Sequence, residues 1–269
     1  MPEFEPESEY NSLVATLISS FLEIFLSGVD RSNRILSIVN SNPTCAGAEA
    51  LATSIISAAK LCPRQIDDLV LSTKFIFPSV KTLTVNDQPD GHPVPFTDLF
   101  RCYLAEYIDD ILYETQYYEP KQTEITSTNP ILVTSLLSAS AINNGLLEEN
   151  QASYHFIRQG LQFDDVPIDS EREPVVALGA CLQLSIAGVV MMRRWLAQSN
   201  GRATILNALN NLKDSRVILT PRGKQLLKKT IENAEMQFTL PLSPATAWDL
   251  VFAPSGNQWW YEKWLSISS

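Results

Sequence analysis

The apolar positions of this chain recur at the spacing of an α-helix along most of its length. Val14, Ile18, Phe21, Leu22 and Phe25 lie three to four residues apart, which places them on one face of a first helix. The same spacing, or a continuous apolar run, predicts further helices over residues 97–118, 131–147, 152–161, 174–199, 202–212, 221–235 and 245–252. Strand patterns are nearly absent, with brief alternation at 81–85 and short β-like connectors at 217–219 and 238–240. The sequence therefore predicts an all-α protein, a multi-helix bundle of about ten helices.

Several prolines mark the expected helix starts. Each follows a side chain that can accept a hydrogen bond from the first turn, and proline has no N–H of its own to satisfy. The strong pairs are Asn42–Pro43, Asn129–Pro130, Thr220–Pro221 and Ser243–Pro244. Weaker starts are expected at Cys62–Pro63 and Glu173–Pro174.

Polar and proline-rich stretches divide these helices into two predicted lobes. Residues 78–95 hold four prolines and form a long loop, while the polar stretch 119–129 is the expected lobe boundary. The predicted organisation is an acidic N-terminal arm (1–12), an N-terminal helical lobe (13–118), a C-terminal helical lobe (130–253) and an aromatic C-terminal arm (254–269).

One segment has no polar face. Between Val175 and Met192 only Gln183 and Ser185 interrupt the apolar run, and its length is at the lower limit for crossing a membrane. A helix that is apolar on all sides lies either in a protein core or in a membrane. We interpret the helix over 174–198 as the buried centre of the C-terminal lobe.

Charge is distributed unevenly along the chain, whose net charge is −10. Between Arg193 and Lys229 nine basic residues and one acid give +8, whereas the rest of the chain carries −18. Opposite charge attracts a polyanion or an acidic protein. The residues predicted to bind RNA or an acidic partner are Arg193, Arg194, Arg202, Lys213, Arg216, Arg222, Lys224, Lys228 and Lys229. We call this set the basic island.

The members of the basic island differ in where they lie within the predicted helices. Cations near helix C-termini are stabilised by the helix dipole, which supplies a structural role for Arg193, Arg194, Lys228 and Lys229. Arg222 and Lys224 fall in a predicted first turn, where the dipole opposes a positive charge. The sequence therefore indicates no structural role for these two residues.

The C-terminus is rich in aromatic residues. Four of the five tryptophans lie in the last 22 residues, and Trp and Tyr are enriched at binding hot spots. The residues predicted to mediate self-association are Trp248, Trp259, Trp260, Tyr261 and Trp264. The alternative is a tail that folds back onto its own core.

The residues that common enzymes require are scarce. The chain has two histidines, its four cysteines form no CxxC pair, and it lacks a nucleophile elbow, a phosphate-binding glycine loop and a dinucleotide fingerprint. We therefore predict no enzymatic activity, no metal and no cofactor. The alternative is a Mg²⁺-dependent enzyme that uses Glu106, Asp109 and Asp110, as helical terpenoid synthases use carboxylates, although the full aspartate-rich motif of those enzymes is missing.

Three function hypotheses follow. The first is a non-enzymatic helical assembly protein, expected to be a homo-oligomer, that self-associates through its terminal arms and binds RNA or an acidic protein through the basic island. Its architecture would be similar to that of helical nucleoproteins and capsid proteins. The second is the Mg²⁺-dependent enzyme, and the third is a monomeric interaction scaffold. Because residues 1–10 carry four Glu and no Lys or Arg, we expect no secretory leader, no membrane association and a cytoplasmic location.

Overall fold

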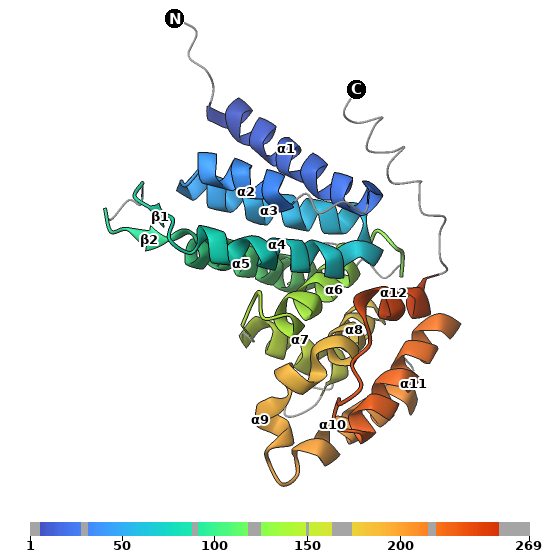
Figure 1. Cartoon of the computed structure of the whole chain (residues 1–269). Coiled ribbons are helices and arrows are strands. Elements are labelled where there is room, and N and C mark those ends of the chain that lie inside the picture. The colour runs from blue at the N-terminus through green and yellow to red at the C-terminus, as the bar shows by residue number, and fades with distance from the viewer. Residues whose placement is uncertain are drawn as a thin grey trace, which may run out of the picture. The chain divides into compact units, whose positions relative to one another are not determined.

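The computed structural model describes residues 6–27, 32–87, 91–117, 125–148, 151–162, 174–214 and 219–252. These ranges contain twelve α-helices, one 3₁₀ helix and a hairpin of two two-residue strands (Figure 1). The predicted all-α fold is confirmed.

The chain forms two compact units. The first comprises residues 1–59 and 68–110, and the second comprises residues 60–67 and 111–269. The lobe boundary predicted at 119–129 falls in part outside the described residues.

The first unit is built from the helices of the N-terminal half. Its elements are α1 (Pro6–Ser27), α2 (Ser32–Ser41), most of α3 (Cys45–Leu61), most of α4 (Ile66–Val80), β1 (Thr84–Val85), β2 (Val94–Pro95) and the first part of α5 (Phe96–Tyr117). Because α1 begins at Pro6, residues 6–12 are helical, although the sequence placed them in an acidic arm. Glu7 and Glu9 lie in the first turn, where the helix dipole favours negative charge.

The proline-rich stretch at 78–95 is more regular than predicted. The helix α4 continues through Pro78 to Val80, and Val85 then pairs with Val94 in the antiparallel hairpin. The carboxylate of Asp87 accepts the backbone N–H of Cys45 at 3.0 Å, which ties the hairpin to the start of α3. The segment is therefore held by the pairing of β1 with β2 and by the hydrogen bond to the start of α3.

The second unit is built around α8 (Pro174–Met191). The helix packs against α6 (Pro130–Asn143), α7 (Gln151–Leu161), α11 (Pro221–Glu235) and α12 (Pro244–Val251), as Figure 1 shows. The remaining elements are η1 (Pro63–Gln65), α9 (Arg193–Leu196) and α10 (Gly201–Asp214). By length and composition α8 could cross a membrane, with a mean hydropathy of 2.0, yet 83% of its residues are buried within the protein. Ala180, Leu184 and Ala187 are 0% exposed, as expected for a helix buried in the centre of its lobe.

Three of the predicted helix starts are capped as the sequence indicated. Asn129 Oδ1 accepts the N–H of Ile131 at 3.0 Å, Thr220 Oγ1 accepts that of Gly223 at 3.0 Å, and Ser243 Oγ accepts that of Thr246 at 3.1 Å. In each case the following proline is the first helical residue. These bonds define where α6, α11 and α12 begin.

The fourth predicted start, Asn42–Pro43, is wrong. The helix α3 begins at Cys45, and Thr44 Oγ1 accepts the N–H of Gly47 at 3.0 Å. Asn42 instead donates its side-chain amide to the carbonyl of Ile38 at 2.8 Å, at the end of α2. Thr44 is thus the cap, because it stands three residues before the N–H that needs an acceptor.

Candidate interaction groove

Helices α10 and α11 run antiparallel and lie next to each other in Figure 1. The guanidinium of Arg202, near the start of α10, donates to the backbone carbonyl of Glu235, the last residue of α11. The end of α10 and the start of α11 therefore meet at the opposite end of the pair. This arrangement brings Lys213 close to Lys224.

A groove of about 460 Å³ lies along this helix pair. Its apolar lining comes from Leu212 on α10, Leu219 before α11, and Leu227 and Ile231 on α11. Positions 224, 227, 228 and 231 share a face because residues three and four apart are neighbours on a helix. The same face of α11 thus supplies both apolar and charged lining residues.

Three members of the basic island line the groove: Lys213, Lys224 and Lys228. Lys213 and Lys224 are exposed and have no ion-pair partner within the described part of the chain. Lys228 Nζ lies 3.9 Å from a carboxylate oxygen of Glu232, at the limit of an ion pair. The groove therefore offers two uncompensated positive charges and a third that is weakly compensated.

The opposite end of the groove has Glu232 and Glu235 in its lining. Lys229 donates to Glu232 at 2.7 Å, and this hydrogen bond lowers the pKa of the Glu232 carboxyl, which keeps it ionised. The lysines without an ion-pair partner thus lie near the end of α10 and the start of α11, whereas Glu232 is ion-paired with Lys229 and lies 3.9 Å from Lys228.

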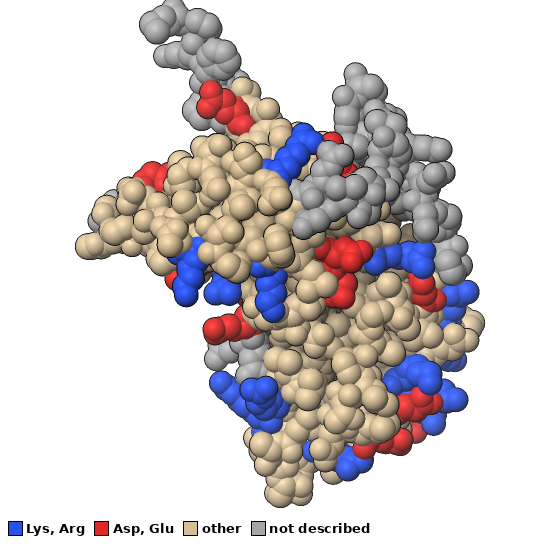
Figure 2. All heavy atoms as spheres, viewed as in Figure 1, with Lys and Arg blue, Asp and Glu red and all other residues tan. Residues whose placement is uncertain are grey.

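The other described arginines of the basic island lie outside this groove. Arg193 and Arg194 are exposed on α9, and Arg202 is hydrogen-bonded as described above. On the face shown in Figure 2, Lys and Arg residues over α11 are interleaved with Asp and Glu, and a second group lies over α9. Arg216 lies outside the described residues.

Arg222 has a structural role that the sequence did not indicate. Its Nη1 donates to the carbonyl oxygens of Asp249 at 3.0 Å and Phe252 at 3.1 Å. These carbonyls belong to the last turn of α12 and its C-cap, where backbone oxygens lack partners within the helix. Arg222 therefore fastens the end of α12 to the start of α11.

The residues predicted for self-association divide in two. Trp248 is only 4% exposed and its ring lies 4.4 Å from that of Phe252, so it belongs to the core of its own unit. This burial removes Trp248 from any exposed arm. Trp259, Trp260, Tyr261 and Trp264 lie outside the described residues.

Glu106, Asp109 and Asp110, the carboxylates of the magnesium hypothesis, do not form a cluster with other metal-binding side chains among the described residues. Glu106 and Asp110 are exposed and Asp109 is half-buried on α5. Among the residues that the structure describes, no group of three or more His, Cys, Asp or Glu side chains could hold a metal ion. Asp67, on α4, is structural, because it accepts hydrogen bonds from Ser140 Oγ and Asn144 Nδ2, each at 2.9 Å.

The buried thiols are poor nucleophiles. Burial raises the pKa of the Cys181 thiol to about 12, and it also raises the pKa of Cys62. Burial and the neighbouring Asp87 raise the pKa of Cys45. Because the thiolate is the reactive form of cysteine, these three thiols are poorly suited to covalent catalysis.

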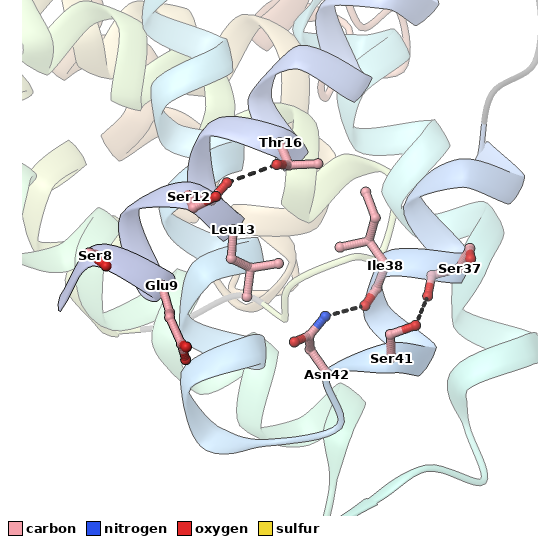
Figure 3. A pocket seen from close by; sticks show the side chains of 9 residues that line it. All are labelled: Ser8, Glu9, Ser12, Leu13, Thr16, Ser37, Ile38, Ser41 and Asn42. Carbon is pink, nitrogen blue, oxygen red and sulfur yellow. Dashed lines mark hydrogen bonds between the residues drawn. The ribbon is translucent and has the colours of Figure 1, made fainter. Parts of the chain in front are cut away.

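A second hollow, which the sequence did not suggest, lies between α1 and α2. Figure 3 shows its lining of hydroxyl and amide side chains with Glu9, and its volume is about 570 Å³. Several of these groups are already bonded to their own helices: Thr16 donates to the carbonyl of Ser12, Ser41 to that of Ser37 and Asn42 to that of Ile38. Its described lining contains one carboxylate and no cation, so it lacks the lysines of the α10–α11 groove.

Comparison with known protein families finds no match, and comparisons with curated proteins and with solved structures find no significant similarity. The functional argument therefore depends on the groove itself.

Proposed function

We propose that this chain is a non-enzymatic helical assembly protein that binds an acidic segment of a protein partner in the α10–α11 groove. The observation that carries the proposal is the combination of Lys213, Lys224 and Lys228 with an apolar lining in one groove. Lysines attract and orient an acidic partner, while apolar lining residues contribute binding free energy when they are removed from water.

The chemistry of the groove favours a protein partner over RNA. Proteins that hold single-stranded nucleic acid combine a basic groove with aromatic side chains on which bases stack. Among the described residues that line this groove, four side chains are aliphatic and none is aromatic.

An amphipathic helix is the form of acidic segment that fits best. Helices bind grooves through apolar residues three and four positions apart, and the lining of α11 has the same spacing. Acidic residues beside that apolar stripe would face Lys213 and Lys224. Self-association through Trp259, Trp260, Tyr261 and Trp264 is the second part of the proposal and is supported by the sequence alone.

Binding of a defined peptide tests the groove. The probe is a fluorescein-labelled 12-residue peptide with Leu at helical spacing and Glu at the flanking positions, measured by fluorescence anisotropy. We expect the Lys213→Glu/Lys224→Glu variant to bind it at least about tenfold more weakly, since two attractions become repulsions.

The matched control makes the same charge change outside the groove. Arg193→Glu/Arg194→Glu also reverses two exposed cations, and we expect it to weaken binding by no more than about twofold, because neither residue lines the groove. Equal losses in both variants would show that net charge alone attracts the peptide and would overturn the proposal. Tighter, groove-dependent binding of a 12-nucleotide oligouridylate would assign the groove to nucleic acid instead.

A further inference from the structure

Three exposed apolar side chains lie close together at the end of α8. Val189 is 39% exposed, Met236 is 51% exposed and Leu240 is 59% exposed. A Cβ on Gly188 would clash with the ring of Phe238, so the turn that follows α11 packs against α8 directly beside Val189. Exposed apolar side chains that lie together, rather than singly, mark surfaces that contact another molecule.

The turn that carries Met236 and Leu240 has an unfavourable backbone conformation. Gln237 and Phe238 have positive φ angles of 56° and 57°, which residues other than glycine rarely adopt. Asn233 supports the turn, because its backbone carbonyl accepts the N–H of Phe238 at 2.7 Å and its Oδ1 accepts that of Leu240 at 3.1 Å. Phe238 is only 1% exposed, so burial of its ring fixes a turn that keeps Met236 and Leu240 in solvent.

Two arginines of the basic island lie next to these apolar side chains. The short helix α9 follows α8 directly and carries Arg193 and Arg194, four and five residues beyond Val189 (Figure 1). Arg202, near the start of α10, donates to the backbone carbonyl that precedes Met236, so α9 connects the end of α8 to the neighbourhood of this turn. Arg193 and Arg194 are exposed and have no ion-pair partner within the described part of the chain. We call the following set the α9 surface: Val189, Arg193, Arg194, Met236 and Leu240.

The N-terminal segment of the chain has a complementary composition. Its four carboxylates belong to Glu3, Glu5, Glu7 and Glu9. Residues 1–9 contain no Lys or Arg, and Phe4 supplies an aromatic side chain. Glu7 and Glu9 are exposed in the first turn of α1 and have no ion-pair partner among the described residues, which do not include residues 1–5. The segment therefore offers negative charge together with an apolar group.

We propose that residues 1–9 of one copy bind the α9 surface of a second copy. The proposal rests on the self-association that forms part of the proposed function, and it identifies a second contact for that assembly. Guanidinium groups form paired, charge-assisted hydrogen bonds with carboxylates, so Arg193 and Arg194 hold the acidic side chains of the segment. Phe4 covers the neighbouring apolar side chains and removes them from water.

Charge distinguishes the N-terminal segment from the aromatic C-terminal arm as the occupant of the α9 surface. The chain after Phe252 contains one acid, Glu262, and one base, Lys263, so it offers no net charge to the two arginines. The first nine residues carry four acids. Opposite charge attracts and orients two partners, which favours the N-terminal segment.

The contact joins two different surfaces. Each copy can therefore insert its N-terminal segment into one neighbour and receive the segment of another. Contacts of this kind close into rings or extend into filaments. Because the contact depends on exposed charges, we expect salt to weaken it.

Charge reversal on each side tests the contact. The segment variant is Glu3→Arg/Glu5→Arg/Glu7→Arg/Glu9→Arg, and the surface variant is Arg193→Glu/Arg194→Glu. Each full-length chain is treated with nuclease, checked for helical content by circular dichroism and analysed by sedimentation velocity at low salt. We expect both variants to associate at least about tenfold more weakly than the wild type, because attraction becomes repulsion.

Mixing the two variants tests whether the two sides meet. In the mixture the reversed segment encounters the reversed surface, and the native segment of the other variant encounters the native surface. Both encounters are attractive, so the mixture should regain the mass of the wild-type assembly. A regained mass also shows that both variants are folded.

The control makes the same change in net charge as the surface variant, but at other positions. Lys60→Glu/Lys81→Glu reverses two exposed cations outside the α9 surface and should keep the wild-type mass. Equal loss of mass in this control would overturn the inference, because net charge would then govern association.

The remaining results separate the inference from the function on which it rests. Variants that keep the wild-type mass, or a mixture that stays as small as its components, would overturn the inference alone. A wild-type chain that stays monomeric would overturn both the inference and the proposed self-association.

Discussion

At the scale of single residues, Gln183 is the least expected member of the core. The side chain lies on α8 and is 0% exposed, and neither its amide nitrogen nor its amide oxygen has a hydrogen-bond partner among the described residues. Burial of an unpaired polar group costs about 1–3 kcal/mol. This residue therefore lowers the stability of the second unit.

Replacement of Gln183 by Met should stabilise the protein. The thioether is similar in length and has no strong hydrogen-bonding group, so the desolvation cost disappears and we expect a gain of about 1–3 kcal/mol in the free energy of unfolding. Urea denaturation followed by circular dichroism measures the gain. Gln225→Met, at an exposed position of α11, is the control and should change stability by less than about 0.5 kcal/mol. A loss of stability in Gln183→Met would mean that the amide is satisfied in solution.

The four cysteines should differ in how fast they react with iodoacetamide. Only the thiolate reacts with iodoacetamide, and a pKa of about 12 leaves Cys181 with about one thiolate in ten thousand molecules at pH 8. Cys102 is exposed. We expect mass spectrometry of the folded protein at pH 8 to show rapid alkylation of Cys102 and protection of Cys62 and Cys181. All four should react in guanidinium chloride, and equal reactivity in the folded state would contradict the assigned burial.

At the scale of elements, helix starts were predictable where the cap and the first proline act within one turn. Asn129, Thr220 and Ser243 each accept a hydrogen bond from an N–H two or three residues later, so the surrounding fold has little influence on the bond. Asn42 carries the same local signal, but its amide is used at the end of α2 and Thr44 is available two residues later. The local sequence thus locates the start of a helix to within a few residues. Which of two adjacent side chains caps the helix depends on packing.

Packing of α8 makes a clear prediction for Leu184. The side chain is 0% exposed at the centre of the helix, so Leu184→Ala removes buried apolar atoms and leaves a cavity. We expect a loss of about 2–5 kcal/mol in the free energy of unfolding. Val189→Ala is the control, because Val189 is 39% exposed on the same helix and should cost much less. Similar losses at both positions would show that helix propensity, rather than burial, dominates the effect.

At the scale of the whole molecule, the open question is assembly. The proposal assigns self-association to aromatic residues after Pro254, since Trp248 is buried in its own unit. Deletion of residues 257–269 should then give a folded species of lower mass in analytical ultracentrifugation, because hot-spot aromatics contribute most of an interface's binding free energy. Trp248→Phe is the control, since it alters an aromatic residue of the core and should leave the mass unchanged. A deletion variant that retains the native oligomer would refute this part of the proposal.

The amino-acid sequence by itself determined the fold class and most helix positions, because these depend on spacing and capping within a few residues. It also identified α8 as a core helix, since a segment without a polar face must be surrounded by apolar material. The basic island was visible as a charge excess, but the sequence did not show which of its nine members lie together.

Only the tertiary structure decided which of those residues act together. Lys213 and Lys224 share a groove because α10 and α11 pack antiparallel, whereas Arg222, two residues before Lys224, is bonded to the end of α12. Hydrogen bonds of a helix cap form between residues that are close in the chain, so the sequence specifies them. A groove forms between two helices, and the way those helices pack determines which residues line it. The spacing of residues along one helix does not specify that packing.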